Sequence, residues 1–127
     1  MNLRRRNWMA ASLVLLGTLL TVSRGAHGAD PEKPFPAKLV TLVVPFTAGS
    51  GSDTISRVIA PKLSARWGQP VVVDNRPGAS GNIGTQHVAR SAPDGHTLLM
   101  AINTFTITPA LYKNLPYDPI RDFVPIG

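Results

Sequence analysis

Three stretches of the chain are apolar at their centres and are separated by polar, glycine-containing segments. They are residues 38–46 (KLVTLVVPF), 69–76 (QPVVVDNR) and 97–102 (TLLMAI). Short apolar runs rich in valine and leucine indicate strands that are buried on both faces, which is typical of parallel sheets. The pattern therefore predicts three parallel strands.

After the first run, large apolar side chains recur at every fourth position, as expected for one face of a helix. They are Ile55, Ile59, Leu63 and Trp67, with Val58 beside them. We expect Ser52 to cap this helix and Gly68 to end it. Pro61 lies inside the pattern, so we expect a kink there or a helix that restarts near Ala60.

A second helix is predicted over residues 82–91, with Ile83 and Val88 on one side. Beyond residue 102 we expect mainly loop, with one helical turn over 108–112 that has Pro109 at its first position. Residues 123–127 resemble the start of a further strand.

The order β-α-β-α-β predicts an α/β fold with right-handed crossovers and a parallel sheet. In such sheets ligands bind beyond the carboxyl ends of the strands. Three loops leave those ends, at residues 46–53, 74–82 and 102–106, and all are rich in small or polar residues. The first two lead into helix N-termini, where unpaired N–H groups favour an anion.

The N-terminal residues have the layout of an exported protein. Basic residues in 1–8 precede an apolar run over 9–22, and small residues follow at Ala26 and Gly28. We therefore predict a signal peptide over 1–28 and export to the periplasm, by the general secretory or the twin-arginine route. Residues 29–37 hold three prolines and are expected to form an extended lead-in.

Without the predicted signal peptide the chain carries nine basic and seven acidic residues, a net charge of +2 rather than +6. The high net charge is therefore no argument for nucleic-acid binding. The chain has no cysteine, and His87 and His96 are not at metal-ligand spacing. No cofactor or metal is expected, and no catalytic constellation accompanies Ser50 and Ser52.

The glycine-containing loop over 47–52 leaves alternatives open. It could be a plain strand-to-helix turn, with Asp53 as an ordinary helix-start residue. It could also belong to a dinucleotide site, because Gly49 and Gly51 give G-x-G and Asp74 follows at a suitable distance. Against this, Thr54 stands where the third glycine would be, and Asp53 would repel a pyrophosphate.

Two blocks of sequence carry a family resemblance: LVVPFTAGSGSDTISRVIAPKLSARWGQPVVVDNRPGASGNIGTQHVARSAPDGHTLLM and NTFTITPALYKNLPYDPIRDF. Together they closely resemble the substrate-binding receptors of tripartite tricarboxylate transporters, the Bug-type extracytoplasmic solute receptors. The resemblance runs from about Lys38 to the end of the chain. It implies a periplasmic-binding-protein-like (Venus flytrap) fold of two lobes, of which residues 38–127 would be an incomplete N-terminal lobe.

The resemblance also implies a function. Such receptors are not enzymes; they hold a small carboxylated metabolite and deliver it to membrane permease subunits, here expected from a monomer. The residues that match ligand-facing positions are Phe46, Thr47, Ala48, Gly49, Ser50, Asp53, Asn103 and Thr104. The family often has proline where Thr47 stands and glycine where Ser50 stands.

Members of this family are more than twice as long, so we expect a truncated form. A flytrap closes by hinge motion between two lobes, and one lobe cannot trap a ligand in that way. The alternative interpretations are an exported nucleotide-binding α/β protein and a non-functional fragment of a disrupted receptor gene.

Overall fold

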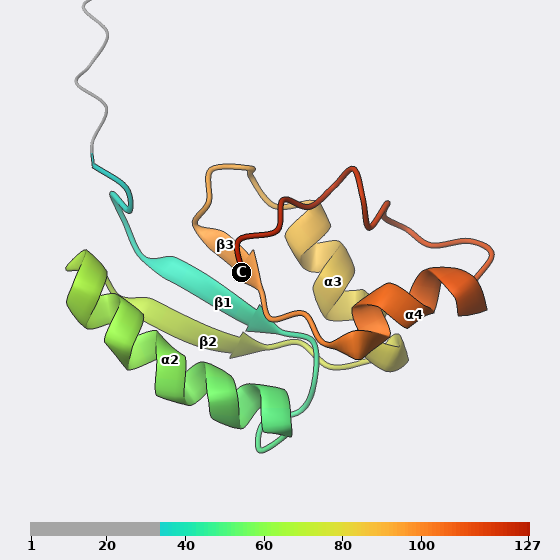
Figure 1. Cartoon of the computed structure of the whole chain (residues 1–127), viewed down its shortest axis with the longest axis horizontal. Helices are drawn as coiled ribbons and strands as arrows, with labels where there is room; N and C mark the ends of the chain where they lie inside the picture. The colour runs from blue at the N-terminus through green and yellow to red at the C-terminus, as the bar shows by residue number, and fades with distance from the viewer. Residues whose placement is uncertain (1–33) are drawn as a thin grey trace, which may run out of the picture. The chain divides into compact units, whose positions relative to one another are not determined.

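A computed structural model describes residues 34–127 of the chain (Figure 1). The predicted signal peptide and most of the predicted lead-in lie outside these residues. Among residues 34–127, no helix combines the length and the apolar character needed to cross a bilayer.

The core of the fold is a three-stranded parallel sheet. Its strands are β1 (Val40–Val44), β2 (Val71–Asn75) and β3 (Thr97–Leu99), in the spatial order β2-β1-β3. In the register, Val40 lies beside Val71 and Thr41 beside Thr97. The predicted parallel α/β architecture is therefore confirmed. The strands are shorter than the apolar runs from which they were predicted.

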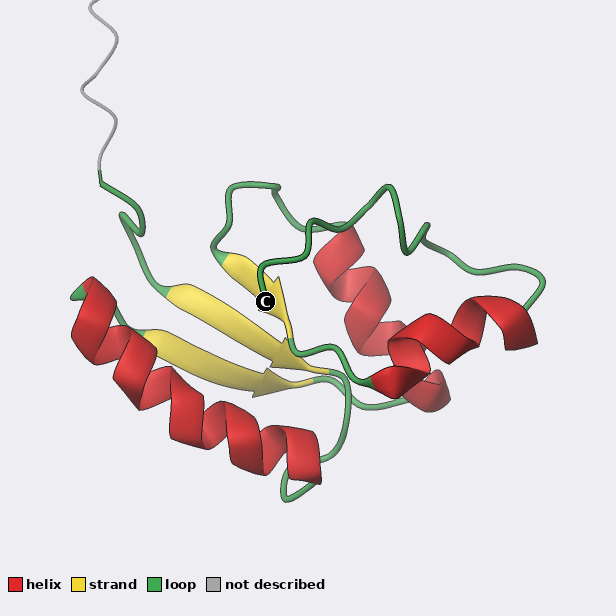
Figure 2. Ribbon diagram, in the orientation of Figure 1, coloured by secondary structure: helices red, strands yellow, loops and turns green. Residues whose placement is uncertain are grey.

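The helices cover both faces of this sheet (Figure 2). α2 (Gly51–Trp67) packs on β1 and β2, and α3 (Asn82–Ala89) packs on β3 and β1. The first crossover leads from β1 to the edge strand β2, and the second leads from β2 past β1 to β3, in the opposite direction. Because such crossovers are right-handed, the two helices lie on opposite faces. Accordingly Val40, Val43 and Val44 of β1 are fully buried, as predicted for a strand covered on both sides.

The face that α2 turns to the sheet differs from the prediction. Ile55, Val58 and Ile59 are exposed, Ile55 by 51%. The residues that α2 buries are Ser52, Asp53, Ser56 and Ala60. Small side chains at these positions let the helix lie close to the sheet, and only in its second half do Leu63 and Trp67 reach the core. The apolar residues do recur at every fourth position, but Ile55 and Ile59 lie on an exposed side of the helix and not on its buried face.

The ends of α2 were predicted with mixed success. Gly68 ends the helix in the left-handed conformation, at φ 66°, as expected. The N-cap is Ser50 and not Ser52, which is instead buried within the first turn. The helix also runs without interruption through Pro61, so the expected restart near Ala60 is wrong.

α3 begins and ends close to the predicted bounds, yet Ile83 is exposed. The buried residues of this helix are Asn82, Gly84 and Thr85. A Cβ atom at Gly84 would lie 2.8 Å from the carbonyl oxygen of Arg76 and 2.8 Å from the Cα of Pro45. Because glycine has no side chain, the backbone of α3 can pack directly against the backbone at the end of β1.

The prediction for the residues after β3 was wrong. Residues Asn103–Leu111 form the helix α4, and Pro109 lies inside it rather than at its first position. β-Branched residues make this segment a weak helix former by itself. Tertiary contacts compensate, since Thr108 is buried and the Phe105 ring packs edge-on against Phe123 at 5.1 Å.

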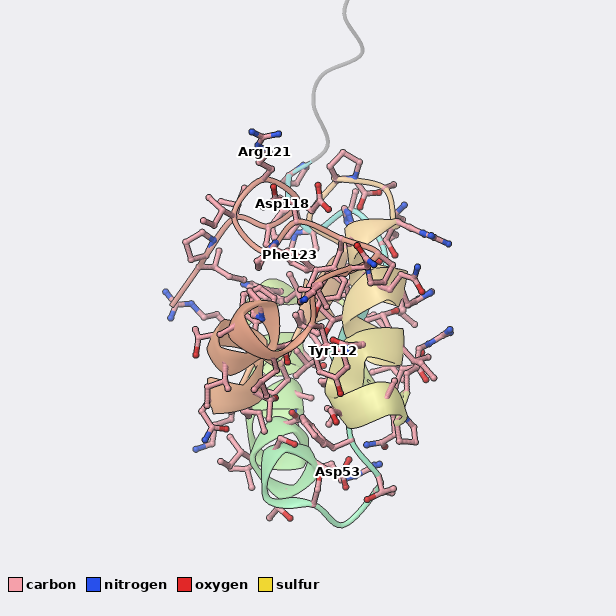
Figure 3. All side chains as sticks on the ribbon, turned by 90° about the vertical axis from the view of Figure 1, so that its right-hand side faces the viewer. Asp53, Tyr112, Asp118, Arg121 and Phe123 are labelled. Atoms are coloured by element: carbon pink, nitrogen blue, oxygen red, sulfur yellow. The ribbon has the colours of Figure 1, made fainter. Side chains whose placement is uncertain are left out.

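The residues after α4 return along the molecule without forming a strand, so residues 123–127 do not form the expected strand. Tyr117 and Phe123 hold this segment against α3 and α4, respectively. The Tyr117 hydroxyl donates to Asn82 Oδ1 at 2.8 Å. Phe123, which is labelled in Figure 3, packs on Phe105, and its ring lies 6.0 Å from that of Tyr117. A strand needs a partner to complete its hydrogen bonds, and none of the described strands pairs with these residues.

Candidate functional site

The carboxyl ends of the three strands meet at one edge of the sheet, and a loop leaves each of them. We call residues 46–50 the β1 loop and residues 76–81 the β2 loop; the third connection is residues 100–102. Each loop leads into the N-terminus of a helix: α2, α3 and α4, respectively, with the short 3-10 helix η1 (Ala79–Gly81) before α3. The predicted gathering of these loops at one edge is therefore present.

The β1 loop presents main-chain donors to the solvent. Thr47, Ala48 and Gly49 are exposed, and Gly49 has a φ of 83°, which favours glycine. Among residues 34–127, the N–H groups of Thr47, Ala48, Gly51 and Ser52 donate no hydrogen bond to a backbone or side-chain acceptor. The last two belong to the first turn of α2, where the helix dipole adds partial positive charge.

Ser50 shapes the start of α2. Its hydroxyl accepts from the Asp53 N–H at 3.3 Å, and its carbonyl accepts from the Thr54 N–H at 2.9 Å. Its Oγ also lies 3.2 Å from that of Ser52. The side chain that the sequence placed among the ligand-facing residues is therefore also the helix cap.

Asp53 was predicted to face the ligand, but its side chain lies inside the protein, with 3% of the residue exposed. Oδ2 accepts from the Gly49 N–H at 2.8 Å, and Oδ1 accepts from Asn75 Nδ2 at 3.0 Å. Arg57 Nε lies 3.0 Å from both oxygens. The hydrogen bond from the Arg57 guanidinium, followed by that from Gly49, lowers the pKa of Asp53 to about 2.

Asn75 is a site residue that sequence reasoning missed. It ends β2 and reaches across to the neighbouring strand's loop, where Nδ2 donates to the Phe46 carbonyl at 3.1 Å. Its Oδ1 accepts from Arg57 Nη2 at 3.1 Å. The sequence pattern did not single it out, although its place at the carboxyl end of a strand beside β1 was a usable signal.

The other two loops contact the first. The Phe46 ring borders Gly81, where a Cβ atom would lie 3.3 Å from Cζ. Thr104, in the first turn of α4, lines a small pocket together with Pro45, which precedes the β1 loop, and Ser80 of the β2 loop. Asn103 is exposed at the first position of α4 and does not line that pocket.

Buried polar side chains surround the base of this pocket, and the sequence had not singled them out. The Thr85 hydroxyl donates to the Gly81 carbonyl at 2.9 Å, and Asn82 accepts from Tyr117. Burial raises the pKa of the Tyr117 hydroxyl. These contacts fix the β2 loop against α3 and the C-terminal segment.

The family follows from the sequence match to a known receptor group. Residues 55–127 match the family model described as the tripartite tricarboxylate transporter family receptor. The chain belongs to this receptor family. The resemblance in the two sequence blocks is thereby confirmed.

Two curated relatives of this receptor family illustrate the match. The chain is 41% identical over 113 residues to the UPF0065 protein in the tcbD-tcbE intergenic region of Pseudomonas sp. (strain P51), covering 89% of this chain and 34% of the relative. It is 42% identical over 121 residues to Protein BugT of Bordetella pertussis (strain Tohama I), covering 94% and 37%. The chain thus spans about a third of the length of these relatives.

Solved structures of periplasmic receptors share the fold. The periplasmic binding protein BugD superposes with a TM-score of 0.70 at 44% identity, over 73% of this chain and 31% of that one. MatC (Rpa3494) from Rhodopseudomonas palustris, solved with bound malate, gives 0.62 at 38% identity, over 72% and 31%. Rpa4515 from R. palustris, solved with adipate, gives 0.63 at 44% identity, over 67% and 29%.

These receptor structures confirm the fold class, an incomplete lobe of a periplasmic-binding-protein-like fold. The competing dinucleotide hypothesis gains nothing from the geometry. Asp74 Oδ2 accepts from Arg76 Nε at 2.7 Å, so the carboxylate proposed for a ribose is engaged by its neighbour. Among residues 34–127, no group of three or more His, Cys, Asp or Glu side chains is arranged to hold a metal ion.

Proposed function

We propose that the chain is part of the N-terminal lobe of a periplasmic solute-binding receptor that captures a small carboxylate for a tripartite tricarboxylate-type transporter. The observation that carries this proposal is the exposed β1 loop with its unpaired N–H groups. They lie at the carboxyl edge of the sheet and include the first turn of α2.

The chemistry of these donors suits a carboxylate. The N–H groups of Thr47 and Ala48 belong to the loop, and those of Gly51 and Ser52 begin the helix. A carboxylate has two oxygens that accept several hydrogen bonds, and a helix N-terminus favours negative charge. The two arginines of this edge, Arg57 and Arg76, are each paired with an aspartate. Main-chain donors therefore supply most of the attraction for an anion.

The remaining predicted residues have subordinate places in this proposal. Phe46 and Gly49 shape the β1 loop, and Ser50 caps α2 while its hydroxyl lies beside the donors. Asn103 and Thr104 begin α4 and would approach the ligand from the third loop. The bound metabolites of two relatives, malate and adipate, are both dicarboxylates and support this ligand class.

The wider assignment follows the family. We propose that the protein is exported by an N-terminal signal peptide, acts in the periplasm as a monomer without catalysing a reaction, and passes its ligand to membrane permease subunits. The periplasmic description of BugD supports the location.

A titration followed by NMR tests the proposal on the chain itself. Backbone amide signals of the chain without residues 1–28 would be recorded with increasing malate, adipate and, as a neutral control, succinamide. We expect the dicarboxylates to shift the signals of residues 47–52, with a Kd on the order of 1 mM because one lobe supplies the contacts. Equal shifts with succinamide, or dicarboxylate shifts confined to other residues, would contradict the proposal.

A further inference from the structure

The proposed anion site contains a buried acid, which is unexpected. Asp53 lies within the first turn of α2, directly beneath the donors of the β1 loop, and its carboxylate is ionised because its pKa is about 2. A carboxylate ligand approaching the loop would meet a like charge, and at short range this repulsion opposes binding. Something in the fold must compensate for that charge.

Arg57 is placed to do this. It lies one turn after Asp53 on α2, and its Nε is 3.0 Å from both carboxylate oxygens. The Nη2 group of the same guanidinium donates to Asn75 Oδ1, and Asn75 Nδ2 donates back to Asp53. The three side chains therefore form a closed ring of hydrogen bonds with no net charge.

The ring is tied to both ends of the β1 loop. Asp53 accepts from the N–H of Gly49, near the end of the loop, at 2.8 Å. Asn75 donates to the carbonyl of Phe46, at its beginning, at 3.1 Å. Within the loop itself, the Ser50 N–H donates to the Thr47 carbonyl at 3.1 Å. The ends of the loop are thus fixed from α2 and β2, and the residues between them remain exposed.

We infer that Asp53, Arg57 and Asn75 act as one positioning unit, which holds the β1 loop in place and cancels the negative charge beneath it. None of the three is a ligand contact in this arrangement. The holding role stands on the hydrogen bonds alone, whereas the role of charge cancellation rests on the proposed function.

A different role for Arg57 would be direct contact with the anion, since its side chain is 55% exposed. The geometry favours the positioning role, because Nε and Nη2 both point to partners inside the unit. The two roles differ in what removal of Asp53 should do. If Arg57 only compensates Asp53, neutralising both residues together relieves the repulsion.

Hydrogen exchange tests the holding role without any ligand. We expect Asp53→Ala to raise the exchange rate of the Gly49 amide by about tenfold to a hundredfold, because a hydrogen bond to a charged acceptor is lost. The matched control is Asp74→Ala, which removes the exposed ion pair with Arg76 at the end of β2. Asp74→Ala should leave the exchange rate of the Gly49 amide unchanged. Both variants should leave the exchange rate of the Val43 amide in β1 unchanged.

Asp53→Asn, which keeps one acceptor oxygen, should give a smaller increase than Asp53→Ala. Asn75→Ala provides a second route if Asp53→Ala does not fold, and should also raise the Gly49 rate. An unchanged Gly49 rate in a folded Asp53 or Asn75 variant overturns the holding role.

Malate titration of Arg57 variants tests the charge role. Arg57→Gln should weaken malate binding at least about tenfold, and Arg57→Lys should recover part of the affinity because the charge is kept. The double variant Asp53→Asn/Arg57→Gln should bind malate more tightly than Arg57→Gln alone. Binding by the double variant that is as weak as that of Arg57→Gln would show that Arg57 contacts the anion and would overturn the inference.

Discussion

The β1 loop and the β2 loop leave neighbouring strands at the same edge, yet they are held by different means. Side chains hold the β1 loop: Ser50 caps α2, and Asp53 and Asn75 bind its main chain. The β2 loop leads into α3 without a side-chain cap. Its support comes from the Thr85 hydroxyl, which donates to the Gly81 carbonyl, and from the Gly81 N–H, which donates to the Gly78 carbonyl. Ala79 and Ser80 adopt positive φ angles of 48° and 57° there, which is uncommon for residues other than glycine.

The two loops therefore have different roles at this edge of the sheet. A loop held by hydrogen bonds to charged and polar side chains can leave its own N–H groups exposed to a ligand. The β2 loop, which turns through left-handed residues, is instead the neighbour against which the Phe46 ring lies at Gly81. Variants that break one means of support and spare the other should therefore separate folding from binding.

The largest effect is expected at Gly84, where α3 meets the end of β1. Gly84→Val would force a side chain into backbone atoms 2.8 Å from its Cβ, so we expect a loss of about 3 kcal/mol in the free energy of unfolding. Urea unfolding measures this. Gly51→Ala is the control, because no atom lies within 4 Å of its added Cβ. A loss for Gly84→Val no larger than that for Gly51→Ala would refute the close packing.

The next effect concerns the support of the β2 loop by the C-terminal segment. Tyr117→Phe removes the buried hydroxyl that donates to Asn82 Oδ1 and should cost about 1–2 kcal/mol of unfolding free energy. Tyr112→Phe is the matched control, because its exposed hydroxyl lies 3.5 Å from Ser80 Oγ. Thermal melting compares the two, and equal melting temperatures would argue against a structural role for the Tyr117 hydroxyl.

Substitution of one serine in each loop should change the free energy of unfolding in opposite directions. Ser50→Ala removes the cap of α2 and should lower the free energy of unfolding by about 1 kcal/mol. Ser80→Gly places glycine at a φ of 57° and should be neutral or stabilising by up to about 1 kcal/mol. Urea unfolding of both variants tests this, and stabilisation by Ser50→Ala would contradict the capping.

The smallest effect under ordinary conditions is the dependence of stability on pH. The folded-state pKa of Asp53, about 2, lies below the ordinary value of 3.8. Its contribution is therefore complete above about pH 5 and is lost as the pH falls from about 4 to about 2. The difference in unfolding free energy between the wild type and Asp53→Asn should shrink over that range. A difference that stays constant down to pH 2 would exclude the ionised Asp53 as its source.

Much of the architecture could be predicted because it depends on local patterns. The short runs rich in valine or leucine identified the three strands, and the alternation of strands with helical segments identified a parallel sheet. Gly68 marked the end of α2 for a conformational reason that holds in any context. Since carboxyl ends of parallel strands share an edge, the gathering of the three loops could also be expected.

Other features could not be predicted, because they depend on residues that are distant in the sequence. α4 forms although its β-branched residues disfavour a helix, since Phe123 packs on Phe105 from 18 positions away. The buried face of α2 consists of small residues because the distance between helix and sheet sets the size that fits. Periodicity in the sequence reports hydrophobicity and carries no information about that distance.

The β1 loop shows the same division within one site. By itself the sequence determined a glycine-containing turn at the start of a helix, and with it a set of N–H groups that no helical carbonyl can satisfy. Only the tertiary structure decided the place of Asp53, because Asn75 comes from another strand and closes the ring with Arg57. Whether an acid faces a ligand or supports a loop depends on which donors surround it, and those donors meet only in the folded chain.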